Sequence, residues 1–302
     1  MVDNNSEEES RNKLVEYEKV LNEKIKVLYL DDNYGSAGGF KRGLEMAYDD
    51  PECEFIWLLD DDNKPMEGSL KTLLDFYNSL EVEHKEEKIA LLSYRFKKEK
   101  LAEEAIIRNK PEMILGSRNS FLGFHIKDIH KKIYRYFKRR FKLIDTDILR
   151  ENYKKFGAVP VAPYGGLFFN KNIINRIGYP NEDFYLYADD HEWSYRITKT
   201  GGKIYLVLDS KIDDLELSWN FPKSNKDTSF AILSKGDPYR VYYGVRNRVF
   251  FEVNNLVDSK IIYWINILVY LLLVNLSSTK NTKLILKAIK DGYKGKLGKA
   301  VI

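Results

Sequence analysis

Three consecutive aspartates, Asp60, Asp61 and Asp62, follow directly after an apolar segment at residues 55–59, and this junction constrains the fold more than any other feature of the sequence. Five aromatic or branched residues in a row predict a short buried strand. Carboxylates at the end of such a strand predict a loop at the edge of a sheet, where like charges repel one another and lose hydration against the core.

A hard divalent cation would relieve this repulsion between the aspartates. Mg²⁺ and Mn²⁺ prefer oxygen ligands and commonly lie between one or two carboxylates and a substrate phosphate. Because side chains alternate along an extended segment, Asp60 and Asp62 are expected on one side and Asp61 on the other. The alternative is an acidic turn that faces water.

The residues before this junction predict a second ligand-binding feature. A strand is expected at residues 25–30, followed by a glycine-rich turn at residues 33–43 that enters a helix ending near Tyr48. Glycines let backbone N–H groups approach a ligand closely, and a helix N-terminus favours anions. The spacing matches neither the dinucleotide fingerprint nor the Walker loop, so a tight turn without a ligand is the alternative.

Strands and helices alternate through this part of the chain. A helix is expected at residues 68–80 and a further strand at residues 88–94, which predicts an α/β sheet with helices on its faces. Ligands of such sheets gather outside the carboxyl ends of the strands. The aspartate triplet and the glycine-rich turn both lie at such ends, so the two features are expected to converge on one edge of the sheet.

A second acidic segment occupies residues 183–196. Asp189 or Asp190 is expected to cap a helix that begins there, and Glu192 is expected to pair with Arg196 four residues later. One interpretation is simply a well-capped amphipathic helix. The other makes one of these aspartates a general base near a helix N-terminus, among aromatic side chains. His191 is interpreted as an exposed helix residue.

The remaining expected elements are extended chain at 159–170 with a break at a glycine pair, a helix at 171–177, strands at 203–208 and 211–217, and a helix beginning near Asp237. The tyrosines of this last helix recur at helical spacing, which is typical of a core. Its arginines, Arg240, Arg246 and Arg248, could also reach a phosphate.

Charge is unevenly distributed along the 302 residues. Lys+Arg 49 against Asp+Glu 45 gives a net charge of +4, but residues 131–142 hold seven basic residues and no acid, and residues 280–299 hold seven lysines and one acid. Such patches suit phosphates, membranes or nucleic acid, or are a solvated face. No nucleic-acid module surrounds residues 131–142, so a segment over the active site that contacts acceptor or membrane is favoured there.

One cysteine and one apolar segment bear on the cellular location. Cys53 is the single cysteine, which excludes an intrachain disulfide and fits a reducing cytoplasm. The N-terminus is acidic and polar and shows no signal peptide. The longest apolar run, residues 261–276, is shorter than the roughly 20 residues of a spanning helix. It is therefore expected to be either a buried helix or a helix in the membrane interface.

Four segments together, residues 2–6, 33–43, 57–62 and 189–196, resemble family 2 glycosyltransferases in order and spacing. The similarity extends over roughly residues 2–250, and within the family it is greatest to the bacterial galactofuranosyltransferase and rhamnosyltransferase branch. It implies an α/β fold of the GT-A class, in which helices flank a mixed sheet, and an inverting transfer of a sugar from a nucleotide sugar.

The resemblance also implies roles for individual residues. Asp60 and Asp62 match positions that hold Mn²⁺ or Mg²⁺ against the donor diphosphate, and Asp190 matches the catalytic base. The donor-binding positions that it implies are Asp3, Asn33, Gly38, Gly39, Arg42 and Asp61. The acceptor-binding positions are Gly165, Gly166, Asp189, Glu192 and Trp193.

The sequence departs from the family pattern in two places. Members normally begin with a further strand and helix, so the chain is expected to lack the first strand of the domain and one wall of the base pocket. Members often carry a metal-ligand histidine after the strand that here ends near Leu208; the matching place holds Asp213 or Asp214, and Asp213 is taken as the third ligand.

The sequence thus predicts a GT-A domain at residues 1–235 and a helical region at residues 236–302. The expected enzyme moves galactofuranose from UDP-galactofuranose, or rhamnose from dTDP-rhamnose, to a cell-surface glycan or polyprenyl-linked acceptor. It is expected in the cytoplasm, peripheral at the inner face of the membrane, without a nucleic-acid partner; a homo-oligomer is compatible with the sequence. The alternatives are a metal-dependent nucleotidyltransferase and a truncated remnant that binds nucleotide sugar without turnover.

Overall fold

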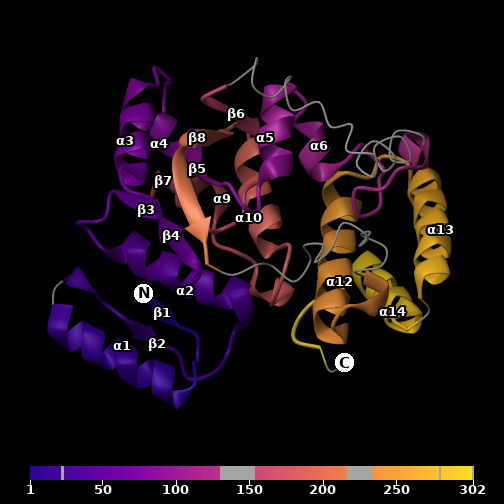
Figure 1. Ribbon diagram of the computed structural model, residues 1–302, viewed down its shortest axis with the longest axis horizontal. Coiled ribbons are helices and arrows are strands. Elements are labelled where there is room, and N and C mark those ends of the chain that lie inside the picture. The colour runs from indigo at the N-terminus through magenta and orange to yellow at the C-terminus, as the bar shows by residue number, and fades with distance from the viewer. Residues whose placement is uncertain (22–23, 130–153, 216–232, 279, 301–302) are drawn as a thin grey trace.

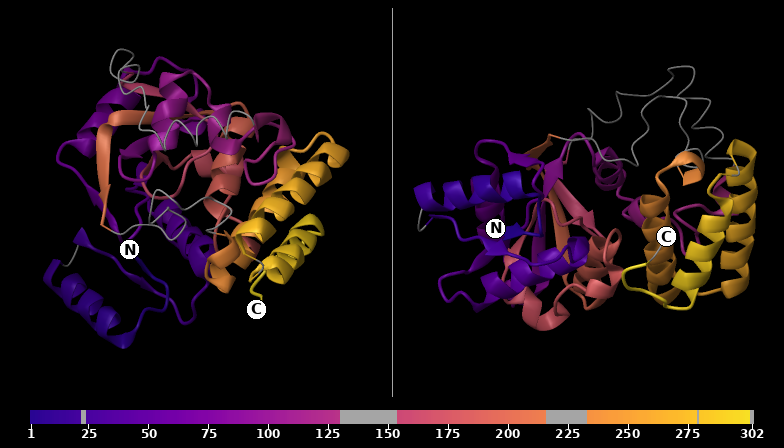
Figure 2. Two further views of the ribbon diagram at one scale, coloured as in Figure 1. Left: turned by 45° about the vertical axis from the view of Figure 1, so that its right-hand side comes forward. Right: turned by 90° about the horizontal axis from the view of Figure 1, so that it is seen from below.

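The computed structural model describes residues 1–21, 24–129, 154–215, 233–278 and 280–300. Figure 1 shows an α/β part that carries two sheets and, at the other end of the molecule, three C-terminal helices. Figure 2, seen from below, shows the same separation. The basic stretch at residues 131–142 lies outside the described residues.

The smaller sheet is built by the N-terminal segment. Strand β1 (Val2–Asp3) pairs in parallel with β2 (Leu28–Tyr29), and α1 (Glu8–Leu21) connects them. In the described part of the chain, β1 and β2 form a two-stranded sheet separate from the larger one. Helix α2 (Gly35–Asp49) follows, in agreement with the expected helix after the glycine-rich turn.

The larger sheet has six strands in the order β3-β7-β5-β8-β4, with β6 also paired to β8. These strands are β3 (Phe55–Trp57), β4 (Asn63–Pro65), β5 (Ile89–Arg95), β6 (Phe156–Val159), β7 (Leu167–Asn170) and β8 (Lys203–Asp214). Only β5 and β8 are parallel among these pairs, so the sheet is mixed. The expected α/β architecture is therefore confirmed.

One expectation about the strands was wrong. The two strands expected at 203–208 and 211–217 form a single strand, β8, within the described residues. The pairing of β5 with β8 shifts register between Ser93 and Tyr94. Strand β8 continues beyond this irregularity and ends at the acidic edge of the sheet with Asp213 and Asp214.

Helices cover both faces of the larger sheet. All seven residues of β5 are buried, because alternate side chains meet different helices. Leu92 packs in the cluster that contains Leu44 of α2 and Trp193, whereas Leu91 packs in the cluster that contains Leu73. The helices around this sheet are α3 (Ser69–Ser79), α4 (Lys85–Lys88), α5 (Lys100–Ile107), α6 (Glu112–Leu115), α9 (Ile173–Ile177) and α10 (Asp189–Lys199), with short 3₁₀ turns at Ile126–Asp128 and Glu182–Phe184.

The C-terminal helices are α12 (Pro238–Asn255), α13 (Lys260–Ser277) and α14 (Thr282–Tyr293). The Asp237 side chain caps α12 by accepting a hydrogen bond from the Arg240 backbone N–H at 3.0 Å. Tyr242 and Tyr243 are buried in a separate hydrophobic cluster, which confirms the expected core position for these two tyrosines, whereas Tyr239 of the same helix is exposed. In the part of the chain that the structure describes, no helix is long and apolar enough to cross a membrane.

Candidate active site

The aspartate triplet forms the turn between β3 and β4, and Asn63 organises it. The Asp60 backbone N–H donates to Asn63 Oδ1 at 3.0 Å, and Asn63 Nδ2 donates to Asp62 Oδ1 at 2.9 Å and to Asp214 Oδ1 at 3.1 Å. Asn63 lies opposite Asp214 in the antiparallel pairing of β4 with β8. Asp61 is exposed, as the alternation of side chains predicted, whereas Asp60 and Asp62 are half-buried.

Two cations from the end of β5 and the residues after it balance part of this negative charge. Lys98 Nζ lies 2.8 Å from Asp62 Oδ2 and 2.8 Å from Asp214 Oδ1, and its side chain is only 7% exposed. Arg95 Nη2 lies 3.0 Å from Asp214 Oδ1. Asp62 and Asp214 are therefore ion-paired within the protein, in a setting where an unpaired charge would be strongly destabilising.

Asp60 is less well compensated than its neighbours. Its Oδ2 lies 3.7 Å from Arg95 Nη1, beyond hydrogen-bond distance. Burial raises the pKa of Asp60 to about 6; Arg95 opposes that rise, and the negative charges of Asp62 and Asp190 add to it. Asp190 of the second acidic segment is therefore near enough to the triplet for its charge to act on Asp60.

The residues at this edge can offer a divalent cation two carboxylates, Asp60 and Asp62. No group of three or more His, Cys, Asp or Glu side chains that could hold a metal ion occurs within the described ranges. Mg²⁺, however, is usually bound by one or two carboxylates together with substrate phosphates. The buried Oδ2 of Asp214 also has no hydrogen-bond partner. The residues therefore fit a cation that a donor diphosphate helps to hold.

Asp213 does not join this group of carboxylates. It forms an ion pair with Lys97, and its side chain is 32% exposed, whereas the side chain of Asp214 is 0% exposed and lies among Asn63, Arg95 and Lys98. Successive side chains of β8 point to opposite faces. Of the two aspartates that the sequence left open, Asp214 is the one beside the triplet.

The glycines at the start of α2 provide close packing. Gly38 and Gly39 are buried within the helix, whose first residue is Gly35. A Cβ at Gly38 would lie 2.6 Å from Tyr34 Cβ, and one at Gly43 would lie 2.9 Å from Val2 Cγ2. These glycines therefore let α2 approach Tyr34 and β1. Gly35 is the one with a positive φ, +70°, and a Cβ there would lie 2.0 Å from the Tyr185 carbonyl oxygen.

The carboxylate of Asp3 is buried and paired with other protein groups. Arg11 Nε donates to Asp3 Oδ2 at 2.5 Å, and the Ser6 backbone N–H donates to Asp3 Oδ1 at 3.1 Å. The neighbouring Asn4 reaches the glycine-rich turn instead, since its Nδ2 donates to the Gly35 carbonyl at 2.9 Å. Asp3 thus holds the N-terminal segment together in this structure, and the donor role that the resemblance implied for it stays a prediction.

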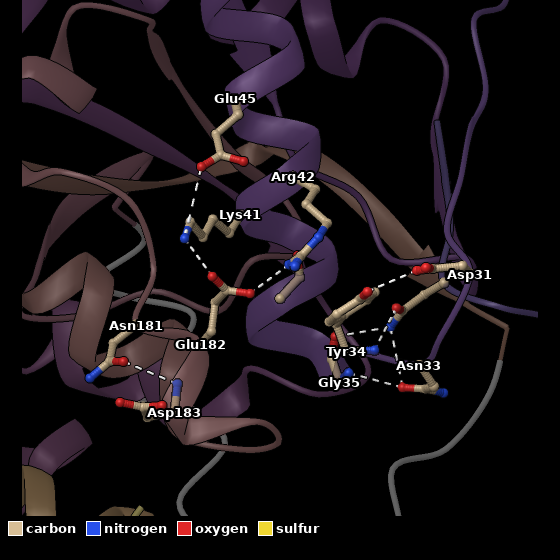
Figure 3. Close-up of polar contacts among 12 residues, drawn as sticks. Asp31, Asn33, Tyr34, Gly35, Lys41, Arg42, Glu45, Asn181, Glu182 and Asp183 are labelled. Atoms are coloured by element: carbon tan, nitrogen blue, oxygen red, sulfur yellow. Dashed lines mark hydrogen bonds and ion pairs between the residues drawn. The ribbon is translucent and has the colours of Figure 1, made fainter. Parts of the chain in front are cut away.

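Arg42 and Asn33 are likewise held by protein groups. Arg42 Nη1 donates to Glu182 Oε2 at 2.6 Å, and its guanidinium lies 3.8 Å from the centre of the Tyr34 ring. Figure 3 shows Glu182 between Lys41 and Arg42 of α2, with Tyr34 and Asn33 at the start of the same helix. Asn33 Oδ1 accepts from the Gly35 backbone N–H at 2.9 Å. Glu182 thus ties the segment before α10 to α2.

A cavity of about 310 Å³ opens beside the N-terminus of α2. It is lined by Asn4, Asn33, Gly35, Ser36, Tyr185, Leu186 and Tyr239. A helix N-terminus favours negative charge because its first backbone N–H groups have no partner within the helix. This cavity adjoins the segment that leads into Asp189 and Asp190, so it is the candidate space for the donor.

The segment before α10 is conformationally strained. Tyr185, Tyr187 and Ala188 have positive φ values of 62°, 67° and 60°, and each such non-glycine residue costs of order 1–3 kcal/mol. Ala188 is the N-cap and has no side-chain cap hydrogen bond, so the expectation that Asp189 or Asp190 caps the helix was wrong. Instead, the two aspartates occupy the first turn, where the helix dipole favours negative charge.

Asn247 of α12 holds this strained segment, which we call the 184–188 loop. Its Nδ2 lies 2.8 Å from the Phe184 carbonyl, 2.7 Å from the Leu186 carbonyl and 2.9 Å from the Tyr187 carbonyl. The adjacent Arg246, 1% exposed, donates to the Phe184 carbonyl at 3.1 Å and to the Gly298 carbonyl at 2.6 Å. Arg246 is therefore buried in structural contacts and does not reach a phosphate.

Asp189 and Asp190 have different environments. Asp189 is buried and accepts a hydrogen bond from Ser36 Oγ at 2.9 Å. Burial and the adjacent charge of Asp190 raise the pKa of Asp189 to about 7. Asp190 is half-buried and accepts from the His191 backbone N–H at 2.7 Å. Of the two, Asp190 is therefore the carboxylate that is more exposed to solvent.

Trp193 is a core residue. Its side chain is fully buried, and Nε1 donates to the Gly178 carbonyl at 2.8 Å. With Trp193 fully buried in this structure, the acceptor contact that the resemblance implied for it stays a prediction. Glu192 forms the expected pair with Arg196, at 2.6 Å. His191, expected to be exposed, is half-buried beside Arg248.

The glycine pair between β6 and β7 lies against the acidic edge. A Cβ at Gly165 would lie 2.3 Å from Asn63 Oδ1 and 2.5 Å from Asp60 Oδ2. Gly166 has a φ of +99°, and its backbone N–H donates to the Leu58 carbonyl at 2.8 Å. The lack of a side chain at Gly165 therefore leaves room for the side chains of Asp60 and Asn63.

The sequence interpretation missed four residues that build this site, namely Asn63, Arg95, Lys98 and Asn247. Arg95 and Lys98 follow the expected strand at 88–94, so their place at the end of a strand was a usable signal. Asn63 directly follows the triplet and was equally visible. Asn247 gave no local signal, because its three partners lie about sixty residues earlier in the chain.

We expect the thermal stability of the Asp189→Asn variant, relative to wild type, to rise as pH increases from about 4 to 7. The folded wild type must keep Asp189 protonated up to its raised pKa of about 7, whereas the unfolded chain ionises at the ordinary value. Protonated Asp189 therefore adds its full contribution to the stability of the wild type at low pH. This contribution is lost as pH rises from about 4 to about 7. Melting curves at pH 5 and pH 8 measure the difference; an equal gap at both would contradict the burial of the charge.

Comparisons with known proteins agree with the architecture. A model of glycosyl transferase family 2 matches residues 1–137, which are therefore a domain of that family. The fold is α/β and GT-A-like, with a mixed sheet flanked by helices and followed by a C-terminal helical region. No curated protein sequence matches the chain.

Solved structures with a similar arrangement are distant in sequence. A crystal structure of GalNAc-T7 with UDP, GalNAc and Mn²⁺ is 14% identical at a TM-score of 0.46, covering 97% of this chain and 51% of that one. S. aureus TarS is 12% identical at a TM-score of 0.43, covering 96% and 48%. The chain thus spans about half the length of these two proteins.

Proposed function

We propose that this chain, whose residues 1–137 are a glycosyltransferase family 2 domain, transfers a sugar from a nucleotide-sugar donor to a hydroxyl group of an acceptor glycan. The observation that supports this most is the meeting of two acidic groups at one edge of the sheet. Asp60 and Asp62 lie on one side, and Asp190 lies close enough that its charge raises the pKa of Asp60. Transfer requires both groups, one for the departing diphosphate and one for the acceptor proton.

In the proposed reaction the acceptor hydroxyl oxygen attacks the anomeric carbon of the donor sugar. The bond from that carbon to the diphosphate oxygen breaks, and the configuration inverts. Asp190 takes the proton of the attacking hydroxyl, a role typically worth about 10²–10⁴-fold in rate. A bound Mn²⁺ or Mg²⁺ supplies Lewis-acid stabilisation of the leaving diphosphate. Asp60 and Asp62 would hold it, while Asn63 fixes the turn that carries both aspartates.

The donor and acceptor classes follow from the sequence resemblance and remain part of this proposal. UDP-galactofuranose and dTDP-rhamnose are the favoured donors, and a polyprenyl-linked or other cell-surface glycan is the favoured acceptor. The division into a GT-A domain at residues 1–235 and a helical region at 236–302, and a cytoplasmic location at the inner face of the membrane, belong to the same proposal. The 310 Å³ cavity beside α2 provides space for the donor.

A nucleotidyltransferase would use the same acidic edge with different substrates. It would bind a nucleoside triphosphate and a sugar phosphate, whereas the proposed enzyme binds a nucleoside diphosphate and its sugar ester. Titrating the chain with UDP, a UDP-sugar and UTP separates the two hypotheses. Preference for UTP, with diphosphate release in the presence of a sugar phosphate, would favour the nucleotidyltransferase.

We expect Mn²⁺ to increase the affinity of the chain for UDP and the Asp60→Asn variant to lose this increase, with affinity in Mn²⁺ falling at least about 10-fold. The amide keeps the shape of Asp60 but removes the charge that the cation requires. Isothermal titration with and without Mn²⁺ measures the effect. The matched control is Asp75→Asn, an exposed aspartate on α3. Equal dependence on Mn²⁺ in the Asp60→Asn variant would contradict the assignment.

A further inference from the structure

Helix α13 exposes a continuous apolar row along its outer side. Exposed fractions are 76% for Ile261, 43% for Ile265, 60% for Leu268, 64% for Leu272 and 84% for Leu276. These positions recur at three- and four-residue steps, so they form one stripe. Large apolar side chains gathered in this way mark an interaction surface, whereas single exposed ones do not.

The inner side of the same helix packs against the hydrophobic core of the C-terminal helices. Tyr263, Ile267, Tyr270 and Val274 are buried in the cluster that α13 shares with α12 and α14. Figure 1 shows α13 at the outer edge of the molecule, at the end opposite α1. The helix thus has two apolar sides, of which the protein core uses one.

A groove between α13 and α14 adjoins the exposed row. Its volume is about 350 Å³, and its walls include Trp264, Leu268, Leu286 and Tyr293. Trp264 and Tyr293 lie together with ring centres 5.3 Å apart. Lys290 and Lys294 also line the groove. The groove therefore combines apolar walls with two positively charged side chains.

Helix α14 extends these two lysines into a basic stripe. Lys283, Lys287, Lys290 and Lys294 are exposed and recur at three- and four-residue steps along one side. Asp291, the one acid between residues 280 and 299, turns to Tyr242, whose hydroxyl donates to it at 2.9 Å. Lys290 and Lys294, which line the groove, are exposed and therefore place positive charge where an external partner can reach it.

We propose that the outer row of α13 and the groove and basic stripe of α14 form a docking surface for a bilayer that contains anionic phospholipid. The apolar row and Trp264 enter the headgroup region, the groove takes part of an acyl chain, and the lysines of α14 contact lipid phosphates. An apolar helix face combined with a polybasic segment supplies the two signals that stable surface binding requires. Trp at such a boundary places an apolar ring in lipid and its N–H toward water.

This inference refines the membrane partner of the proposed function but does not depend on the transfer reaction. Lipid binding needs neither donor nor acceptor, so loss of transfer would leave it intact. The charge of the stripe favours a lipid surface over a second copy of the chain, because two copies would bring the same lysines together. Dimer formation through α13 is the competing outcome of the test.

The experiment is flotation of the purified full chain with vesicles of phosphatidylcholine alone or of phosphatidylcholine mixed with phosphatidylglycerol. We expect binding to the mixed vesicles at least about 10-fold tighter, because each lysine near an anionic surface adds attraction. Raising the salt concentration should weaken that binding, since surface charge is screened within about 8 Å at physiological ionic strength.

Two variants separate the apolar from the basic contribution. The triple change Leu268→Ser, Leu272→Ser and Leu276→Ser should reduce binding to both kinds of vesicle by at least about 10-fold. The double change Lys290→Ala and Lys294→Ala should reduce binding to the mixed vesicles only. All five side chains are exposed, so the variants should keep the wild-type melting temperature.

Matched controls come from α1, at the other end of the molecule. Val20→Ser and the pair Lys13→Ala and Lys19→Ala change exposed residues of the same types and should leave binding unchanged. Equal binding by wild type and the leucine variant would overturn the proposal. So would a dimer in sedimentation that the leucine variant abolishes, together with no binding of the wild type to either vesicle.

Discussion

The Asp190→Asn variant is expected to transfer sugar about 10²–10⁴-fold more slowly than wild type while remaining folded. Asparagine has nearly the same shape as aspartate and can still accept the hydrogen bond from the His191 backbone N–H. It cannot accept the proton of the acceptor hydroxyl. The loss should therefore appear in the rate of nucleoside diphosphate release during transfer, with UDP affinity close to that of wild type.

The control for this change is Asp183→Asn, an exposed aspartate at the start of the same segment. It should transfer at the wild-type rate. An Asp190→Asn variant that retains the wild-type rate would remove Asp190 from the mechanism. A variant that loses UDP affinity and transfer equally would instead assign Asp190 to donor binding.

The Asn247→Ala variant is expected to lose about 1–3 kcal/mol in the free energy of unfolding and most of its transfer rate. The Asn247 amide lies within hydrogen-bond distance of three carbonyl groups of the 184–188 loop. Without it, buried carbonyl oxygens lose their partner, and positive φ values at Tyr185, Tyr187 and Ala188 lose their support. The helix that carries Asp190 begins directly after this loop.

Asn254→Ala provides the comparison, because Asn254 lies on the same helix and is exposed, with its Nδ2 donating to the Phe250 carbonyl at 2.7 Å. It should differ little from wild type in stability and rate. Asn247 is a positioning residue, so transfer at saturating donor, measured well below the melting temperature, should fall more than the affinity for UDP. An Asn247→Ala variant that is less stable but transfers normally would limit Asn247 to stability.

Local patterns in the sequence were sufficient for the main elements. The apolar run before Asp60 predicted β3, and the glycine-rich turn predicted the start of α2. A charge pair at four-residue spacing predicted α10, tyrosines at helical spacing predicted α12, and an apolar run predicted α13. These signals depend on periodicity and on residues close in the chain. The rule that strand ends share one edge of a sheet predicted that the aspartate triplet and the glycine-rich turn lie at the same edge, whereas the link between Asp60 and Asp190 came only from the family resemblance.

The details that failed depend on contacts between distant segments. Whether Asp213 or Asp214 joins the triplet is decided by the pairing of β8 with β4 and β5, and a shift of one residue exchanges the two. Trp193 lies on α10, and the sequence alone did not show that its side of the helix faces the core. There its indole N–H binds the Gly178 carbonyl, a contact between separate segments. The position of Lys98 beside Asp62 depends on the pairing of β5 with β8.

The measurement that tests the central claim most directly is a crystal structure of the chain with UDP and Mn²⁺. We expect the diphosphate and the cation beside Asp60 and Asp62, and the uridine in or beside the cavity at the N-terminus of α2. Bound UDP whose diphosphate lies away from these aspartates would contradict this expectation. So would the absence of nucleotide from this edge in crystals grown at a UDP concentration that saturates binding in solution.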